Sequence, residues 1–260
     1  MEGMMHLQKF NLYLLLSILL CFLILPSTVY AESFPKLTLI TEEWEPYNFR
    51  KNGTIEGIST DVLMLMLERA GSTQARNDIK LYPWARSYKM LQKNTNTLLF
   101  STTRTEEREH MFKWVGPIFN TKYHFYALKN RHIKINSFKD LKKYRIGTIR
   151  KDVIEDLLVK NADMNSKDFD QVSSTLQNII KLSVGRVDLA AQSKESTLNS
   201  CKEAGLNPNN FESVFVLDKN SVYYAFNKET PDSVIAILQT VFDNIRNEGK
   251  LAEIFKKYGK

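Results

Sequence analysis

The sequence predicts an α/β fold in which helices cover largely parallel sheets. Short β-prone runs alternate with helical patterns along most of the chain, an order that is typical of layered α/β domains. The 260 residues are 43% hydrophobic and 25% charged, an ordinary globular composition that provides apolar material for one or two cores. No low-complexity tract and no internal repeat interrupts this pattern.

The first 31 residues have the layout of a secretory signal peptide. Lys9 precedes an apolar run of about 16 residues, Phe10–Leu25, which Pro26 ends, and small residues lead up to Ala31. The run is shorter than the ~20 residues that a membrane-spanning helix prefers. We therefore expect cleavage after Ala31 and export to the periplasm or the cell exterior. The alternatives are a retained membrane anchor and a lipoprotein modified at Cys21.

Charge and cysteine content narrow the range of partners. Cleavage removes Glu2, Lys9 and Cys21, so the mature chain keeps the net charge of +7 and a single cysteine, Cys201. One cysteine forms no internal disulfide, so the core must hold the fold. The positive charge favours an anionic ligand or membrane surface, although lysines at solvated helix ends also account for it. No basic stripe alternates with aromatic residues, so we expect no nucleic-acid partner.

Strands are predicted where short β-branched or aromatic runs lie between turn residues. In chain order these runs are 37–40, 79–82, 98–101, 123–128, 144–149, 187–191, 214–217 and 222–226.

Helices are predicted where apolar residues recur at spacings of three and four behind a capping residue. In chain order they are 62–67, 84–91, a turn from 103, then 137–141, 153–158, 176–180, 231–245 and 251–258. The expected caps are Ser59, Thr60 or Asp61 for the first helix, Thr103 in a capping box with Glu106, and Asp152, with Pro231 as a first helical residue.

The usual catalytic signatures are missing from the chain. It has no H-E-x-x-H, no G-x-S-x-G, no P-loop and no G-x-G-x-x-G. His110, His124 and His132 lack the spacing of metal ligands. We therefore expect a protein that is not an enzyme, with no catalytic residue, no metal and no cofactor.

The segment Phe100–Arg108 is the most informative stretch. A strand ends in hydroxyl residues, turns, and enters a helix with Arg108 in its first turn. Backbone N–H groups at a helix start attract anions, and a guanidinium matches a carboxylate with two parallel hydrogen bonds. Ser101, Thr103 and Arg108 are therefore candidates to hold a carboxylate. The alternative is a capped helix with a solvated arginine.

Aromatic residues also follow the first predicted strand, at the end where open α/β sheets bind ligands. Trp44 and Tyr47 flank Pro46 and can cover a cation or an apolar stem, or they belong to the core. Three acidic residues of the same loop face either a ligand ammonium or solvent: Glu42, Glu43 and Glu45.

The segment Tyr82–Arg86 repeats this pattern at the second strand. A strand end is followed by an aromatic residue, Trp84, and by an arginine at a helix start. Arg86 is therefore a second candidate for binding an anion.

In this order the motifs resemble the family 3 extracellular solute-binding proteins, the polar-amino-acid type that serves ABC importers. The resemblance spans nearly the whole mature chain, over these segments: Leu37–Phe49, Gly53 to Asp61, Tyr82–Arg86, Ser101–Arg108, Ser137–Leu141, Ile146-Gly147, Gly185–Asp188 and Gly249 to Tyr258. It implies a type 2 periplasmic-binding-protein clamshell in which each lobe is a mixed sheet flanked by helices. Lobe 1 would hold residues 32–121 and 219–260 and lobe 2 residues 122–218, with hinge crossings near Phe119–Tyr123 and Leu217–Val222.

The resemblance also implies roles for single residues. Arg108 would bind the ligand α-carboxylate, assisted by Thr103, while the region of Ser101 would help to hold the amino group and Trp44 would supply the aromatic contact.

Two positions depart from the family pattern. Lys151-Asp152 stands where the family often has a glycine and a hydroxyl residue, and Ser193 stands where an aspartate usually pairs with the ligand ammonium. A carboxylate ligand without an ammonium fits this site, and so does an ammonium that is met by Glu42, Glu43 or Asp152.

The function implied is capture of a small polar carboxylate by hinge closure. Arg108, Thr103 and Trp44 would bind the ligand first, and residues around Arg150–Asp152 and Gln192–Ser193 would then close on it. A monomer of this kind would deliver its ligand to an ABC permease. The alternatives are an enzyme of the dehydratase type on the same scaffold and a sensor module that signals to a receptor.

Overall fold

The computed structural model describes residues 34–260, except for the side chains of Asp218 and Lys219. These residues form one compact unit. The predicted signal peptide, residues 1–31, lies outside them. No helix within residues 34–260 is long and apolar enough to cross a membrane.

Eight strands form one sheet in the order β4-β1-β5-β10-β6-β9-β7-β8, and β2 and β3 form a separate hairpin. The strands are β1 (Thr38–Thr41), β2 (Phe49–Lys51), β3 (Thr54–Glu56), β4 (Lys80–Leu81), β5 (Thr97–Thr103), β6 (Phe112–Leu128), β7 (Ile146–Ile149), β8 (Phe169–Val172), β9 (Leu189–Ser193) and β10 (Phe211–Asn227). The helices are α2 (Ile58–Arg69), α3 (Trp84–Lys93), α4 (Glu106–Glu109), α5 (Phe138–Leu141), α6 (Val153–Ala162), α7 (Thr175–Ser183), α8 (Lys194–Glu203), α9 (Asp232–Asn247) and α10 (Lys250–Lys257).

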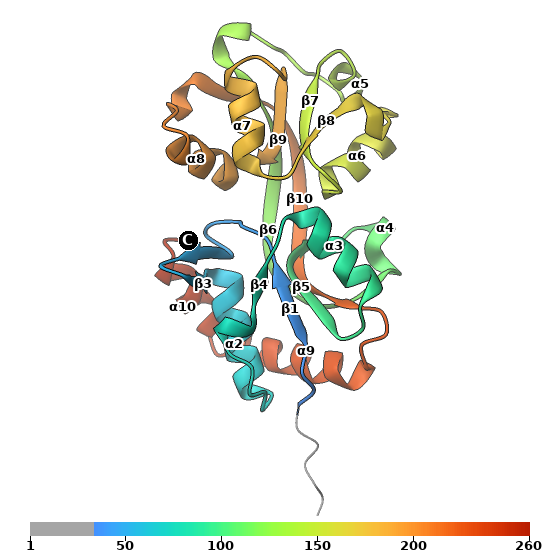
Figure 1. Cartoon of the computed structure of the whole chain (residues 1–260), viewed down its shortest axis with the longest axis vertical. Helices are drawn as coiled ribbons and strands as arrows, with labels where there is room; N and C mark the ends of the chain where they lie inside the picture. Colours follow the sequence, from blue (N-terminus) through green and yellow to red (C-terminus); the bar gives the residue numbers. More distant parts are fainter. Residues whose placement is uncertain (1–33) are drawn as a thin grey trace, which may run out of the picture. The chain divides into compact units, whose positions relative to one another are not determined.

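Helices cover both faces of this sheet, which confirms the predicted α/β class (Figure 1). The neighbours Leu39 and Ile40 of β1 show the reason, because they pack into different apolar clusters on opposite faces. The strands β4, β1 and β5 are parallel, and so are β8, β7 and β9. The long strands β6 and β10 are antiparallel to each other and to their neighbours, so the sheet is mixed.

Two large cores divide the described chain. The first packs α2 and α9 on β1, β5 and the Asn227 end of β10, and the second packs α5 and α6 on β7, β9 and the Leu128 end of β6. We call the elements around these cores lobe 1 and lobe 2 (lower and upper in Figure 1). The predicted lobe limits, 32–121, 122–218 and 219–260, stay a prediction.

The strands β6 and β10 run through both lobes (Figure 1). Their pairing begins at Phe211 with Leu128 and ends at Asn227 with Phe112, so the two strands predicted within 211–227 are one. The predicted hinge segments lie side by side, because Phe119 pairs with Val222. The register shifts between Leu217 and Asn220, between the two cores.

Three predicted helix starts are wrong. The first helix begins one turn earlier than predicted, at Ile58 after Gly57, so Ser59, Thr60 and Asp61 lie inside it. Gly57 has φ 121°, and a Cβ atom there would lie 2.3 Å from the Tyr47 carbonyl oxygen, so only glycine fits this start.

The other two errors concern Thr103 and Pro231. Thr103 is still in β5, and the side chain of Thr105 caps α4 instead by accepting from the backbone N–H of Arg108. Pro231 is the N-cap of α9, one position before the helix. The prediction that Asp152 caps α6 is confirmed. The hairpin β2–β3, the strand β8 and the helix α8 had no prediction.

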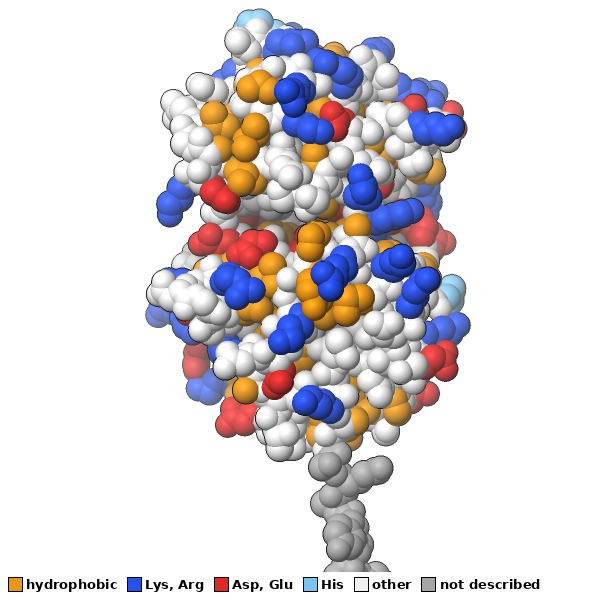
Figure 2. All heavy atoms as spheres, in the orientation of Figure 1, with side chains coloured by type: hydrophobic (Ala, Val, Ile, Leu, Met, Phe, Trp, Pro, Cys, Tyr) orange, Lys and Arg blue, Asp and Glu red, His pale blue; other side chains and the backbone are white. Residues whose placement is uncertain are grey.

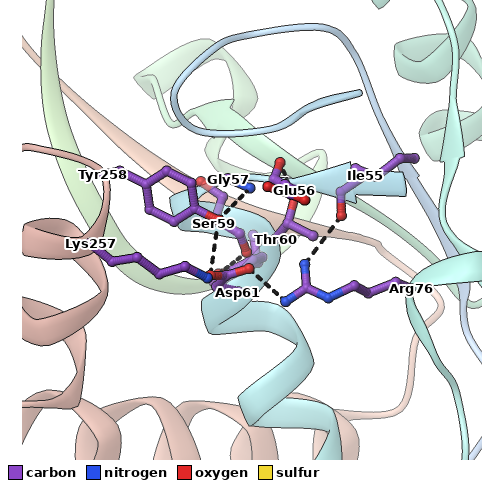
Figure 3. Close-up of polar contacts among 10 residues, drawn as sticks. Ile55, Glu56, Gly57, Ser59, Thr60, Asp61, Arg76, Lys257 and Tyr258 are labelled. Carbon is purple, nitrogen blue, oxygen red and sulfur yellow. Dashed lines mark hydrogen bonds and ion pairs between the residues drawn. The ribbon is translucent and has the colours of Figure 1, made fainter. Parts of the chain in front are cut away.

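Asp61 ties the C-terminal helix to α2 (Figure 3). Its Oδ1 accepts from Arg76 at 2.6 Å, and its Oδ2 accepts from Lys257 at 2.6 Å and from the Tyr258 hydroxyl at 3.0 Å. The Tyr258 hydroxyl in turn accepts from the N–H of Gly57 at the start of α2, at 3.0 Å. Burial alone would raise the pKa of Asp61, but the hydrogen bonds from Lys257 and Arg76 lower it below its ordinary value.

We predict that Asp61→Asn lowers the free energy of unfolding by about 2 kcal/mol, because three charged or polar donors lose a buried carboxylate. The pKa of Asp61 is lowered in the folded protein, so this stabilisation is full above the unfolded pKa of about 3.9. It is lost as the pH falls through the folded pKa. Urea unfolding at several pH values measures both effects.

Asp243→Asn is the matched control, because Asp243 pairs with Arg246 on the exposed face of α9. We expect a change within about 0.5 kcal/mol for this variant. If Asp61→Asn changed the free energy of unfolding as little as Asp243→Asn does, the Asp61 network would add nothing to stability.

Candidate functional site

A cavity between the lobes lies where six parallel strands end. The strands β1, β4 and β5 of lobe 1 and β7, β8 and β9 of lobe 2 direct their carboxyl ends toward it (Figure 1). This is the end of a parallel sheet at which α/β proteins place their ligands. We call it the central cavity. The volume that the centres of water molecules can occupy in it is about 40 Å³.

Eight of the ten predicted site residues line the central cavity. They are Trp44, Glu43, Trp84, Ser101, Thr103, Arg108, Asp152 and Ser193. Each lies at the end of a parallel strand or in the segment that follows it. The structure thus brings these residues together, while their roles in binding a ligand stay a prediction.

Tyr47 and Arg86 are not part of this group. Tyr47 is 5% exposed and stacks on Phe119 in the core of lobe 1, with ring centroids 3.8 Å apart. The side chain of Arg86 lies over the Tyr82 ring and lines a different cavity. The geometry therefore gives no support to the prediction that these two residues contact the same ligand as Arg108.

Arg108 is the buried cation of the central cavity. Only 1% of the surface of Arg108 is exposed to solvent, although a free guanidinium is strongly hydrated. Nη2 donates to Asp156 Oδ2 at 2.9 Å and to the Lys151 carbonyl at 3.4 Å, both in lobe 2. Nε and Nη1 are buried and have no hydrogen-bond partner within residues 34–260. Three N–H bonds of this group therefore remain for an acceptor.

Aromatic rings and a short helix fix the position of Arg108. It is held in α4, and its guanidinium carbon lies 4.9 Å from the Tyr88 ring centroid and 5.7 Å from that of Trp84. The Trp84 Nε1–H donates across the lobe boundary to the Lys151 carbonyl at 2.7 Å. The arginine is thus oriented by contacts from both lobes.

Hydroxyl groups occupy the end of β5. The hydroxyl of Ser101 is in hydrogen-bond contact with Asn48 Oδ1 and lies 2.9 Å from that of Ser59, and Ser101 has φ 60°. The hydroxyl of Thr103 is 2.9 Å from that of Tyr123 on β6. The side chain of Ser101 thus already makes two contacts within lobe 1.

Two half-buried carboxyl groups, Glu42 and Asp152, line the central cavity. Burial, and then the charge of Asp152, raise the pKa of Glu42 to about 8. Burial raises the pKa of Asp152 to about 6, although the charge of Arg108 opposes this shift. Both carboxylates would be stabilised by a cation, because desolvation and like charge are the causes of these shifts.

Sequence and structure comparisons agree on a family. A profile of the bacterial extracellular solute-binding proteins, family 3, matches residues 37–260. The chain belongs to this family. No curated protein sequence matches the chain.

Solved structures show that this solute-binding protein has the type 2 periplasmic-binding-protein fold. It is similar to the arginine-, lysine-, histidine-binding protein ArtJ from Geobacillus stearothermophilus, with 21% identity and a TM-score of 0.70 over 86% of this chain and 96% of that one. It is also similar to an ABC uptake transporter substrate-binding protein from Streptococcus pneumoniae with bound histidine, with 18% identity and a TM-score of 0.71 over 86% and 92%. A histidine kinase sensor domain matches with 16% identity and a TM-score of 0.75 over 86% and 96%.

Position 193 of this solute-binding protein, where the family pattern has an aspartate, is a neutral serine and has no charge to pair with an ammonium. Ser193 caps α8, accepts from the Ser196 N–H at 3.1 Å, and receives the Trp44 Nε1–H from lobe 1 at 3.3 Å. The carboxyl groups of the cavity are instead those of Glu42, Glu43 and Asp152.

Four lining residues had no sequence prediction: Ile149, Thr175, Ser196 and Tyr123. Ile149 is the last residue of β7, and Thr175 and Ser196 follow the ends of β8 and β9, so the rule that predicted Trp44 would have found them if applied to lobe 2. Tyr123 lies within β6, where sequence carries no such signal.

A space of about 300 Å³ adjoins the central cavity. The two share the side chains of Glu42, Glu43, Ile149 and Thr175. The added walls are apolar at Leu81, Pro83 and Leu176 and acidic at Glu203. Apolar and acidic side chains therefore lie beside the central cavity.

Proposed function

We propose that this protein is exported, captures a small amino acid or a related carboxylate that carries a cation, and delivers it to an ABC importer. The observation that carries the proposal is the buried guanidinium of Arg108, with Nε and Nη1 unpartnered, in one cavity with three carboxyl groups of raised pKa. A ligand with both charges satisfies both groups at once. Family membership and amino-acid-binding neighbours support it.

Hinge closure is the proposed mechanism. Lobe 1 supplies Arg108, Thr103 and Trp44, and lobe 2 supplies Asp152 and Gln192, so a ligand that touches all of them favours the state in which the lobes meet. The two lobes have separate cores and are joined by β6 and β10, which supports a rotation between them.

Export is part of the same proposal. The family consists of extracellular proteins, and the sequence predicts cleavage after Ala31. We propose that the mature monomer meets its permease at the membrane surface.

Arg108→Ala should reduce binding of the amino acid that stabilises the wild type in a thermal-shift screen by at least ~100-fold, because a carboxylate loses a buried, charged pair of hydrogen bonds. Calorimetry measures the affinity. The matched control is Arg104→Ala, since Arg104 is a neighbouring arginine that pairs with the partly exposed Glu109. Undiminished affinity in a folded Arg108→Ala variant would remove Arg108 from the site.

The pH dependence of affinity should distinguish the two ligand classes. As the pH rises from 6 to 8, Glu42 and Asp152 lose protons, with pKa values of about 8 and about 6. A ligand with an ammonium should then bind more tightly, by up to ~10-fold per pH unit for each proton released. A carboxylate without a cation should bind less tightly, because negative charge accumulates beside it.

Calorimetry at pH 6, 7 and 8 tests the sign of this slope, and Glu42→Gln should flatten it. A slope that Glu42→Gln leaves unchanged would exclude Glu42 as its cause. The exposed Glu229→Gln is the control, because Glu229 lies outside the cavity.

The second candidate function is sensing, which the similarity to the histidine kinase sensor domain favours. Chromosomal replacement by the Arg108→Ala variant separates the two roles. A transport protein should lose uptake of radiolabelled ligand, whereas a sensor should keep uptake and lose the transcriptional response to the same ligand. Uptake that is unchanged by the variant would contradict the importer role.

A further inference from the structure

A second cavity between the lobes is distinct from the central cavity. It offers about 660 Å³ to the centres of water molecules and shares only Ile149 with the central cavity. The start of α3 contributes one wall from lobe 1, while the ends of β7 and β8 and the helix α7 contribute the others from lobe 2. We call it the basic cavity.

The charge of this cavity is positive and only partly balanced. Four cationic residues line it, and no aspartate or glutamate does: Arg86, Arg150, Lys181 and Arg186. Lys181 forms an ion pair with Asp170. The guanidinium groups of the three arginines form no hydrogen bond or ion pair with any side chain or backbone group that the structure describes. Figure 2 shows Lys and Arg side chains on both sides of the lobe boundary on one face of the molecule.

Different contacts fix the positions of Arg86 and Arg150. The Arg86 guanidinium lies 3.8 Å from the Tyr82 ring centroid, a stacking contact that restricts its rotation. Arg150 directly follows β7 and its backbone N–H donates to the Val172 carbonyl, so its Cα position is fixed by the sheet edge. The positive groups are thus presented by ordered backbone on both lobes, and an anion between them would reduce their mutual repulsion.

The floor between the arginines is apolar. Ile149 and Val172 belong to the apolar cluster that also contains Trp84, and Ile180 adds an exposed side chain. Gln177 Oε1 accepts from the Ser173 hydroxyl at 3.0 Å, which leaves the amide N–H groups of Gln177 available as donors. The volume lies within the range of about 300–1,000 Å³ for small-molecule sites, which combine apolar walls with a few polar groups.

We propose that the basic cavity binds a small organic anion that carries two or more negative groups on an apolar body. The negative groups pair with Arg86 of lobe 1 and with Arg150 and Arg186 of lobe 2, and the apolar body covers Ile149 and Val172. Because the contacts come from both lobes, the anion binds when the lobes meet and favours that state. Binding itself does not depend on the proposed function of the central cavity.

Binding at the two cavities is coupled if the ligand of the central cavity also favours closure of the lobes. This coupling rests on the proposed function. By linkage, an anion in the basic cavity raises the affinity of the central ligand, and the central ligand raises that of the anion by the same factor. The release of ligand would thus respond to a second molecule of different chemistry.

Benzene-1,3,5-tricarboxylate is the probe, because it places three carboxylates around a flat apolar ring. Calorimetry on the mature chain should show one binding event, and Arg150→Gln with Arg186→Gln should weaken it at least ~10-fold by removing two charged contacts. Lys139→Gln with Lys167→Gln is the matched control, because it removes the same charge from exposed positions of lobe 2. We expect the control to change the affinity by less than about threefold.

Methyl and side-chain amide NMR signals locate the probe. The signals of Val172, Ile180 and Gln177 should shift most, while those of Thr103 and Gln192 in the central cavity should shift less, because closure alone affects them. Absence of binding by the wild type, equal weakening in the charge control, or shifts confined to the central cavity would each overturn the proposal. Pyrophosphate that binds as tightly as the tricarboxylate would overturn the requirement for an apolar body. Loss of amino acid binding in Arg108→Ala leaves these outcomes unaffected.

Discussion

The burial of one positive charge at the boundary between the lobes sets the conditions for the rest of the structure. Arg108 is 1% exposed, and its only charged hydrogen-bond partner within residues 34–260 is Asp156, whose side chain is 43% exposed. A buried guanidinium without full pairing costs several kcal/mol. Aromatic faces of Tyr88 and Trp84 offset part of this cost, but two nitrogens keep no acceptor. An arrangement of this kind is stable only if something else supplies negative oxygens.

The remainder of the fold delivers and supports that charge. Six parallel strands end at the cavity, so short segments after them provide nearly every lining residue. The long strands β6 and β10 join two separate cores, so each lobe has a core of its own. The Asp61 network acts on lobe 1 alone, where it fastens α10 to the start of α2. Each lobe is therefore tied internally, and the lobes meet through polar contacts such as Trp84 with Lys151 and through the smaller apolar cluster that holds Ile149 and Val172.

The sequence predicted the residues that line the cavity better than the packing that holds them in place, for a physical reason. The carboxyl ends of parallel strands form one edge, so Trp44, Ser101 and Arg108 are recognisable from their place after strands. Which of two nearby aromatics faces the cavity depends on packing that is distant in sequence. Tyr47 is drawn into the core by Phe119, a residue of the hinge strand.

Helix starts were the weaker part of the prediction. The start at Gly57 depends on the close approach of the Tyr47 backbone, and no local capping pattern contains that information. The direction of Arg86 likewise follows from its stacking on Tyr82 at the start of α3. Local propensity predicts that an element exists, whereas tertiary contact decides where it begins and which way its side chains point.

The central cavity has no acidic residue at position 193, but it has acidic residues at other positions. Ser193 is neutral and is engaged by Trp44 and Ser196, so it is a link between the lobes rather than a partner for a cation. Glu42 follows β1 in lobe 1 and Asp152 precedes α6 in lobe 2. Burial raises the pKa of both carboxyl groups, and the charge of Asp152 raises that of Glu42 further. Two carboxylates on opposite lobes repel each other when both are ionised, so without a cation they oppose closure, and with one between them they favour it. A single aspartate on one lobe would bind a cation equally in both states, but a pair divided between the lobes makes the cation itself part of the closing force.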